Sequence, residues 1–95
     1  MEIEYDSAKE QLNRQKHGIG FARAKTLFDG FRIDDEDDRE DYGETRYVSL
    51  GRVGRQVVVC VWTPRADPKC AVRARIISLR RADKDEREIY NLHCP

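Results

Sequence analysis

Apolar and polar residues alternate along several stretches of the chain, and a period of two is typical of a β-strand with one buried face. Such alternation appears in residues 2–5 and returns in residues 45–50. After turn residues at 51–55, residues 56–62 form an unbroken apolar run, which predicts a strand covered on both faces. We expect the strands at residues 45–50 and 56–62 to form a β-hairpin. The strand at 56–62 should be central in the sheet and end at Pro64.

A period near 3.6 indicates helices before this hairpin. Ser7, with Glu10 three residues later, forms a capping-box pattern, although Asp6 is an alternative cap. We expect this first helix to end at Gly18, because glycine readily adopts the left-handed conformation that closes helices. A second short helix is expected at residues 21–28, where one apolar stripe is formed by Phe21, Ala24, Leu27 and Phe28.

Residues 34–41 hold seven acids in eight positions. So dense a run of like charges repels itself, which predicts a solvated loop. Carboxylates also suit hard cations, but the run lacks the sixth-position Gly and the distal Glu of a calcium loop, so metal binding is the weaker alternative. Residues 31–33, just before the run, are expected to form at most an edge strand.

Asp83 and Glu86 repeat the capping-box spacing and open a C-terminal helix whose apolar residues are Ile89, Tyr90 and Leu92. The order of elements is therefore a strand, two short helices, an antiparallel meander of three or four strands and a final helix. This order predicts an α+β fold, formed by a single domain over residues 1–95, with the helices on one face of the sheet.

The last strand is expected at residues 72–82, and this otherwise apolar stretch carries Arg73, Arg75, Arg80 and Arg81. Long, permanently charged side chains are seldom buried unpaired, so we expect an anion to meet them. Strict alternation turns Arg75 toward the helices, together with Ile77 and Leu79, and leaves Arg80 on the open face. Arg80 is then the foremost candidate for binding an anion, unless these arginines pair with the acidic run.

Charged residues are unevenly distributed along the chain. Residues 1–43 hold 7 basic and 12 acidic side chains, whereas residues 44–95 hold 11 basic and 6 acidic ones, so a formal net charge of zero hides a basic half that is a candidate anion-binding surface. Three cysteines without C-x-x-C spacing fit a reducing compartment, and there is neither a signal-peptide pattern nor an apolar run of membrane-spanning length. We therefore expect the cytoplasm and no membrane.

Two histidines are candidates for proton transfer. His17 lies at the predicted helix end, where an imidazole exchanges protons near neutral pH; a purely structural role at the helix end is the alternative. His93 and Cys94, together with Cys70, give a weaker zinc hypothesis, because no pair has finger-like spacing. Arginine and histidine around a small sheet suit metal-free cleavage of RNA, in which a base frees the 2′-hydroxyl and arginines hold the phosphate oxygens.

Two separated groups of residues form motifs. The stronger motif is residues 75–82, Arg-Ile-Ile-Ser-Leu-Arg-Arg-Ala, followed by Glu86 and Tyr90. The other motif and its surroundings comprise Tyr5-Asp6, Lys9, Asn13, Lys16-His17-Gly18-Ile19, Phe21, Ala24, Phe28-Asp29, Glu44, Arg46 and Gly51. Together they resemble the BrnT family of type II toxins, which usually has Ala where Leu79 stands here.

The resemblance implies a small RelE-like fold and an endoribonuclease toxin that uses no cofactor or metal and inhibits translation and growth. It also implies a BrnA-like antitoxin as partner, through which the complex binds operator DNA. With the arginines of the last strand, the candidate catalytic residues are Arg80, Arg81, Arg75 and His17. The candidate substrate-binding residues are Lys16, Arg65 and Arg73. Two alternatives remain: a non-catalytic module that binds nucleic acid or protein, and a degenerate toxin that only binds its antitoxin.

Overall fold

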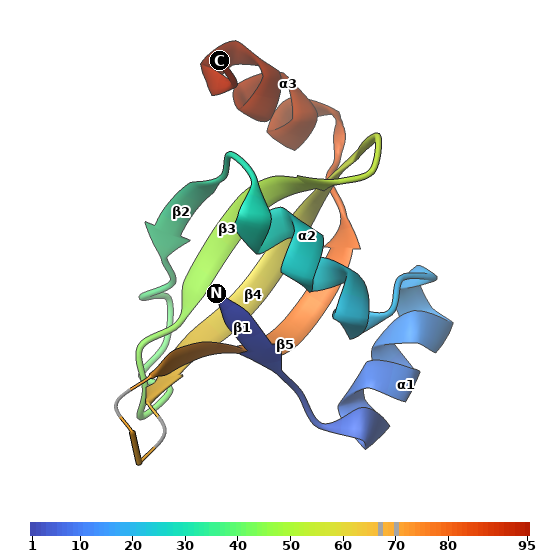
Figure 1. The fold of residues 1–95 in the computed structure, drawn as a ribbon. Helices are drawn as coiled ribbons and strands as arrows, with labels where there is room; N and C mark the ends of the chain where they lie inside the picture. The colour runs from blue at the N-terminus through green and yellow to red at the C-terminus, as the bar shows by residue number, and fades with distance from the viewer. Residues whose placement is uncertain (67, 70) are drawn as a thin grey trace.

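The computed structural model describes residues 1–66, 68–69 and 71–95, in which five strands form one mixed sheet flanked by helices (Figure 1). The strand order is β1-β5-β4-β3-β2, in which β1 runs parallel to β5 and the other neighbours are antiparallel. The α+β class is confirmed. No helix in this described part of the chain is long and apolar enough to cross a membrane. The elements are β1 (Glu2–Glu4), α1 (Ser7–His17), the 3₁₀ turn η1 (Phe21–Arg23), α2 (Ala24–Asp29), β2 (Ile33–Glu36), β3 (Tyr47–Val53), β4 (Gln56–Ala66), β5 (Val72–Arg81) and α3 (Lys84–His93).

The helix α1 begins and ends at residues that satisfy its backbone. The Asp6 carboxylate accepts hydrogen bonds from the N–H groups of Ala8 (2.8 Å) and Lys9 (3.1 Å), so Asp6 is the cap and the Ser7 capping box is wrong. Asp6 has extended backbone geometry, which lets its side chain fold back over the first turn. At the other end Gly18 has a φ of 75°, which confirms the predicted stop.

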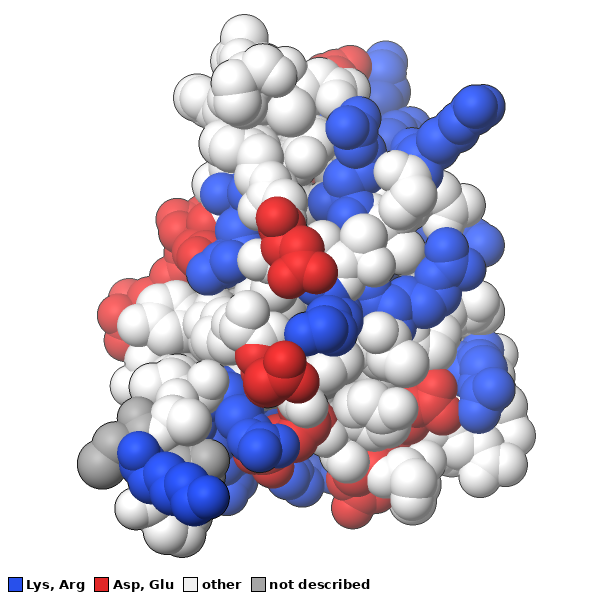
Figure 2. All heavy atoms as spheres, viewed as in Figure 1, with Lys and Arg blue, Asp and Glu red and all other residues white. Residues whose placement is uncertain are grey.

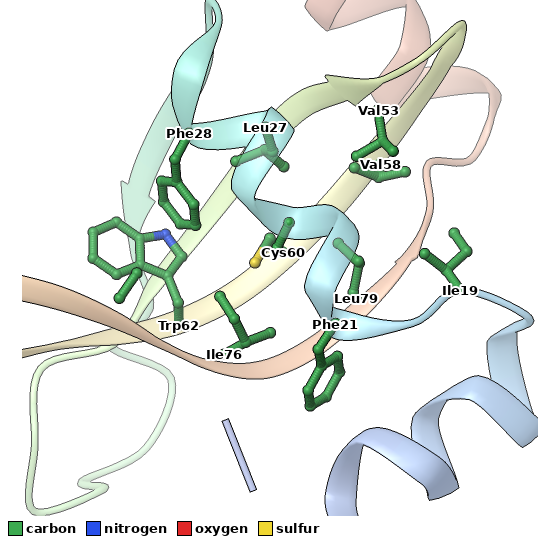
Figure 3. Close-up of a cluster of buried hydrophobic side chains, with 12 residues drawn as sticks. Ile19, Phe21, Leu27, Phe28, Val53, Val58, Cys60, Trp62, Ile76 and Leu79 are labelled. Carbon is green, nitrogen blue, oxygen red and sulfur yellow. The ribbon is translucent and has the colours of Figure 1, made fainter. Parts of the chain in front are cut away.

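The main core lies between the sheet and the layer formed by η1 and α2 (Figures 1 and 3). The predicted stripe is buried there, and it faces side chains of the central strands that include Cys60, Trp62, Ile76 and Leu79. The rings of Phe28 and Trp62 meet edge to face, with centroids 5.1 Å apart. Burial raises the pKa of the Cys60 thiol to about 12, so this side chain stays protonated and serves as a small core residue.

Gly51 lies inside β3 rather than in the turn that the sequence predicted. A Cβ at this position would lie 2.5 Å from Cγ of Leu27, so the absence of a side chain lets α2 approach the sheet. The turn itself is shorter than expected, because Val53 pairs with Gln56 and only two residues connect them. Gly54, the first of these, has a φ of 62°, as a tight hairpin turn requires.

The acidic run is only partly a loop. Its first residues belong to β2, which pairs with β3 at the edge of the sheet, so the predicted solvated loop over residues 34–41 is wrong for this half. Asp37 is buried, and its carboxylate accepts hydrogen bonds from Arg39 and Tyr42. Above all the Arg39 guanidinium holds the pKa of Asp37 at about 2. Acids on an edge strand also discourage pairing with another chain.

The strand β4 does not end at Pro64, as the sequence predicted, but continues to Ala66. Pro64 pairs with Ala74 of β5. The pairing of β3 with β4 already ends at Trp62, so the missing N–H of the proline deprives no third strand of a hydrogen bond. The hairpin of β4 and β5 therefore extends beyond the last pair that β4 forms with β3 (Figure 1).

The strand β5 contains a β-bulge at Ile77. Ser78 pairs with Val61, but the next pair is Ile76 with Trp62, so Ile77 is left over opposite two consecutive residues of β4. An extra residue shifts the alternation of faces by one position for the rest of the strand.

This shift overturns the facing predicted for the first half of β5. Ile76 and Leu79 both lie in the main core, although they are three positions apart. Arg73 and Arg75 therefore point to the face opposite α2, as Arg80 does, and the prediction that Arg75 turns toward the helices is wrong. The bulge keeps arginine side chains away from the main core, while three apolar side chains of β5 stay buried.

The helix α3 begins with the predicted capping box, in which the Asp83 side chain and the Glu86 side chain each accept a hydrogen bond from the other residue's N–H. Its Tyr90 packs with Val57 and Val59, whose side chains lie on the face opposite the main core. Two helical segments thus cover one face, whereas α3 reaches the other face at one end of the sheet (Figure 1).

The close approach of α2 to Gly51 predicts a specific sensitivity. Gly51→Ala should destabilise the fold by about 1–3 kcal/mol, because the added methyl group forces Leu27 and α2 away from β3. Urea unfolding followed by circular dichroism measures the difference. Gly30→Ala is the matched control, since its Cβ would meet only the Thr26 carbonyl oxygen at 4.0 Å; equal midpoints for the two variants would contradict the packing role of Gly51.

Candidate functional site

Asn13 attaches α1 to the edge of the sheet. Its side-chain amide donates to the carbonyl of Leu79 at 2.8 Å, and its Oδ1 accepts from the N–H of Leu79 at 3.2 Å. The parallel pairing of β1 with β5 covers only Glu2–Glu4, so the β5 edge near Leu79 lacks a strand neighbour. The buried Asn13 amide replaces that neighbour, because it offers one donor and one acceptor as a backbone peptide does.

This attachment places the Lys16-His17 motif beside the bulge. A groove with a volume of about 250 Å³ lies between α1 and β5, and its lining includes Lys9, Lys16, His17, Ile77 and Ser78. His17 is half-buried at the last position of α1, and Lys16 is exposed. The structure therefore brings the only histidine of α1 and two lysines to the middle of the arginine-bearing strand.

Four of the candidate arginines share the sheet face opposite α2. Arg73, Arg75 and Arg80 lie there because of the bulge, and Arg65 of β4 lies directly opposite Arg73. Like charges that face each other across strands destabilise a sheet, so the pair Arg65–Arg73 favours an anion between or above them. Ser78 stands on this same face between Arg75 and Arg80, which joins the groove of His17 to the row of arginines.

Arg80 is held in one orientation by α3. Its Nη1 and Nη2 donate to the two carboxylate oxygens of Glu86 at 2.8 and 2.9 Å, and Nη1 also donates to the Arg81 carbonyl at 3.2 Å. The Glu86 carboxylate raises the pKa of Arg80, and the guanidinium lowers the pKa of Glu86. The Nε–H and one Nη2–H of Arg80 bond to no residue that the structure describes, so one two-pronged edge is free for a phosphate.

Arg75 is also paired, with Nη1 3.0 Å from the Glu4 carboxylate of the neighbouring β1. The acids that meet the arginines of β5 are thus Glu4 and Glu86. The acidic run, the partner considered from the sequence, instead pairs with Arg32 and Arg39 near its own strand.

Arg81 is separated from the other candidates. By its pairing with Val58 it belongs to the α2 face at the very end of β5, and there it also contributes to the lining of a second cavity, of about 310 Å³, between the β3–β4 turn and α3. Three further arginines line this cavity, namely Arg52, Arg55 and Arg87. Sequence reasoning missed these three; the spacing of Arg52 and Arg55 around a hairpin turn was the available sign.

Among the described residues, no three His, Cys, Asp or Glu side chains come together to hold a metal ion. His93 is the last residue of α3 and Cys94 is its C-cap, whereas Cys70, the third residue of the zinc hypothesis, lies outside the described residues.

Comparison with known families agrees with the sequence motifs. The model of the family described as "Ribonuclease toxin, BrnT, of type II toxin-antitoxin system" matches residues 5–86. This match runs from the residue before the α1 cap to the first turn of α3, and so includes the groove and the arginines of β5. A search of the curated proteins finds no match.

The link between α1 and β5 predicts that Asn13 is needed for stability. Asn13→Ala should cost about 1–3 kcal/mol, because it leaves both backbone groups of Leu79 without their partner. Gln11→Ala, at an exposed position of the same helix, is the control and should stay within about 0.5 kcal/mol of the parent. Equal urea midpoints for the two variants would show that Asn13 does not hold α1 against β5.

Proposed function

Because the chain belongs to the BrnT ribonuclease toxins of type II toxin-antitoxin systems, we propose that it is a metal-independent endoribonuclease that is neutralised by a cognate antitoxin. The observation that carries this proposal is the bulge at Ile77, which gathers arginines on one sheet face beside the groove of His17. The proposed outcome of RNA cleavage is inhibition of translation and growth.

The chemistry needs a base, an acid and donors for a phosphate. His17, at the groove, is our candidate for removing the proton from the 2′-hydroxyl. The 2′-oxygen then attacks the adjacent phosphorus, the bond to the 5′-oxygen breaks, and that oxygen takes up a proton. The products are a 2′,3′-cyclic phosphate and a 5′-hydroxyl, so no water, metal or cofactor enters the cleavage step.

We assign to arginine the stabilisation of negative charge on the phosphate during cleavage. The free edge of Arg80, with its Nε–H and Nη2–H, fits two oxygens of a phosphate while Glu86 holds the other edge. Such a preorganised donor pair stabilises charge that grows on the phosphoryl oxygens in the transition state. Glu86 is then a positioning residue, and Arg75, Arg73, Arg65 and Lys16 extend the positive surface along the RNA.

The proposed partner is a BrnA-like antitoxin that covers the arginine face, since blocking the anion site is the simplest means of inhibition. Operator DNA would be bound only through that antitoxin. The cytoplasm, where RNA and a reducing environment coexist, is the proposed location. The second candidate function is a binding module that does not cleave, and it is favoured by the ion pairs that already engage Arg75 and Arg80.

Arg80 provides the decisive test of catalysis. Arg80→Ala should lower the rate of RNA cleavage by about 10²- to 10³-fold, because one preorganised donor pair is lost. Arg80→Lys keeps the positive charge but loses the planar pair of donors, so its cleavage rate should lie between those of Arg80→Ala and the parent. Lys25→Ala removes an exposed charge from α2, on the other side of the sheet, and serves as the control. Full activity of a folded Arg80→Ala protein would refute the assignment, and absence of any product from the parent protein would favour the binding module.

Metal independence is tested by chelation. Cleavage of a defined RNA by the purified protein should proceed at the same rate in excess EDTA, because the proposed donors are all side chains. Gel analysis of the products also reports the 2′,3′-cyclic phosphate. Activity that disappears in EDTA and returns with added Mg²⁺ would overturn the metal-free mechanism.

A further inference from the structure

We propose that the cavity between the β3–β4 turn and α3 is a second phosphate site, which binds the backbone of single-stranded RNA away from the scissile phosphate. The proposal that the ligand is RNA rests on the proposed function. The arginines Arg52, Arg55 and Arg87 give this cavity its character, together with Arg81 from the end of β5.

These arginines come from separate parts of the chain. Arg52 is near the end of β3, Arg55 lies in the turn, and Arg87 lies on α3. The Arg87 Nη1 donates to the carbonyl of Ala82 at 2.9 Å, which fixes this side chain at the cavity wall. The fold thus brings four arginines to the lining of about 310 Å³ of space, and none of the described lining residues is an acid.

No ion pair among the described residues compensates the charge in this cavity. Ion pairs among the described residues engage Arg14, Arg32, Arg39, Arg46, Arg75 and Arg80, as well as two lysines, but none engages the four cavity arginines. Arg23 adds to the charge, since its Nη2 would lie 4.0 Å from a Cβ on Gly54. Figure 2 shows basic side chains gathered around this turn, below α3. Like charges held together repel one another, so a bound anion stabilises the arrangement.

Size and lining favour a phosphodiester over a segment of another protein. The volume is at the low end for ligand pockets, which suits a nucleotide-sized group. Val57 and Ala82 are its only apolar lining residues among those described, so an apolar anchor of a protein partner would find little surface. Planar guanidinium groups match phosphate oxygens in pairs, and several of them around one cavity suit a polyanion.

Continuity with the proposed catalytic face identifies the polyanion. Arg80 points to the sheet face on which α3 packs, and Val57 and Arg87 line the cavity on that same side. A strand of RNA whose scissile phosphate lies at Arg80 therefore reaches the cavity along one face, without passing around the sheet. The cavity then holds a phosphate outside the cleavage position and lengthens the RNA that the protein binds.

Binding to an RNA that resists cleavage tests the proposal directly. The probe is a fluorescent single-stranded 2′-O-methyl RNA of about 12 nucleotides, within the range of known single-strand sites. Anisotropy titrations at several salt concentrations give both the Kd and its salt dependence. The variants of the full chain are Arg52→Gln/Arg55→Gln and Arg55→Gln alone. Lys25→Gln is the control for the single variant, because it loses one charge elsewhere on the molecule.

The double variant should bind the probe roughly tenfold more weakly at low salt, and its slope of log K against log salt should fall in magnitude by about 1.4, since each contact on a single strand contributes about 0.7. Arg55→Gln alone should lose about half of that slope, and because Arg55 is exposed in a turn this variant reports even if the double variant unfolds. Unchanged slopes, or an equal loss with Lys25→Gln, would overturn the proposal.

Competition separates RNA from an acidic protein segment. Unlabelled oligoglutamate of matched charge should displace the probe poorly from the parent protein. Displacement as effective as that by unlabelled RNA, and equally dependent on Arg52 and Arg55, would assign the cavity to an acidic peptide instead. These measurements need no cleavage, so a protein that binds through the cavity but does not cut would refute only the catalytic proposal. A protein that cuts while both variants bind as the parent does would refute only this one.

Discussion

A single irregularity of the backbone decides where the charges of this molecule lie. In a regular strand, Arg73 and Arg75 would share a face with Leu79 and would compete with apolar side chains for the main core. The bulge at Ile77 resolves this conflict by moving the first half of β5 through one position. Burying two guanidinium groups without partners would cost far more than one unpaired strand residue, and the bulge therefore follows from the sequence of β5 itself.

The bulge also determines what the neighbouring elements can do. The β5 edge next to it is closed by the Asn13 amide rather than by another strand, which leaves room for a helix to lie alongside. That helix ends at Gly18, so the last residues before the stop, Lys16 and His17, are carried to the groove. On the other side of the strand end, α3 supplies the carboxylate that meets Arg80. Two helices, α1 and α3, thus converge on a strand segment that is short and irregular.

The elements and the main core could be predicted from the sequence because they depend on local patterns. The helix stop at Gly18, the stripe through Leu27 and the capping box at Asp83 are all encoded within a few residues. The facing of Arg75 was predicted wrongly because alternation assumes a regular strand; the adjacent Ile76 and Ile77 were the sign that the pattern changes phase. Gly51 was also misplaced, since its role depends on contact with Leu27, which is distant in the chain. Asp37 was misplaced although its side-chain partners, Arg39 and Tyr42, lie nearby in the sequence.

For the candidate site, sequence motifs identified residues but could not place them. Lys16 and His17 do lie beside the arginine strand, whereas Arg81 lies at its end and lines a separate cavity together with arginines that no motif includes. Which arginine is engaged by which acid depends on register and on helix placement, and neither follows from composition. Charge balance over the two halves of the chain indicated a basic surface, but the structure divides that charge between one sheet face and one cavity.

Glu86 takes part in two interactions at once, and this has a thermodynamic consequence. The same carboxylate accepts the Asp83 N–H that completes the start of α3 and holds the guanidinium of Arg80. Formation of the first turn of α3 and the orientation of Arg80 are therefore linked equilibria. A ligand that binds Arg80 only in its held orientation must stabilise that turn, by the same free energy with which the formed turn strengthens binding of the ligand. The start of α3 is in this way energetically connected to the end of β5.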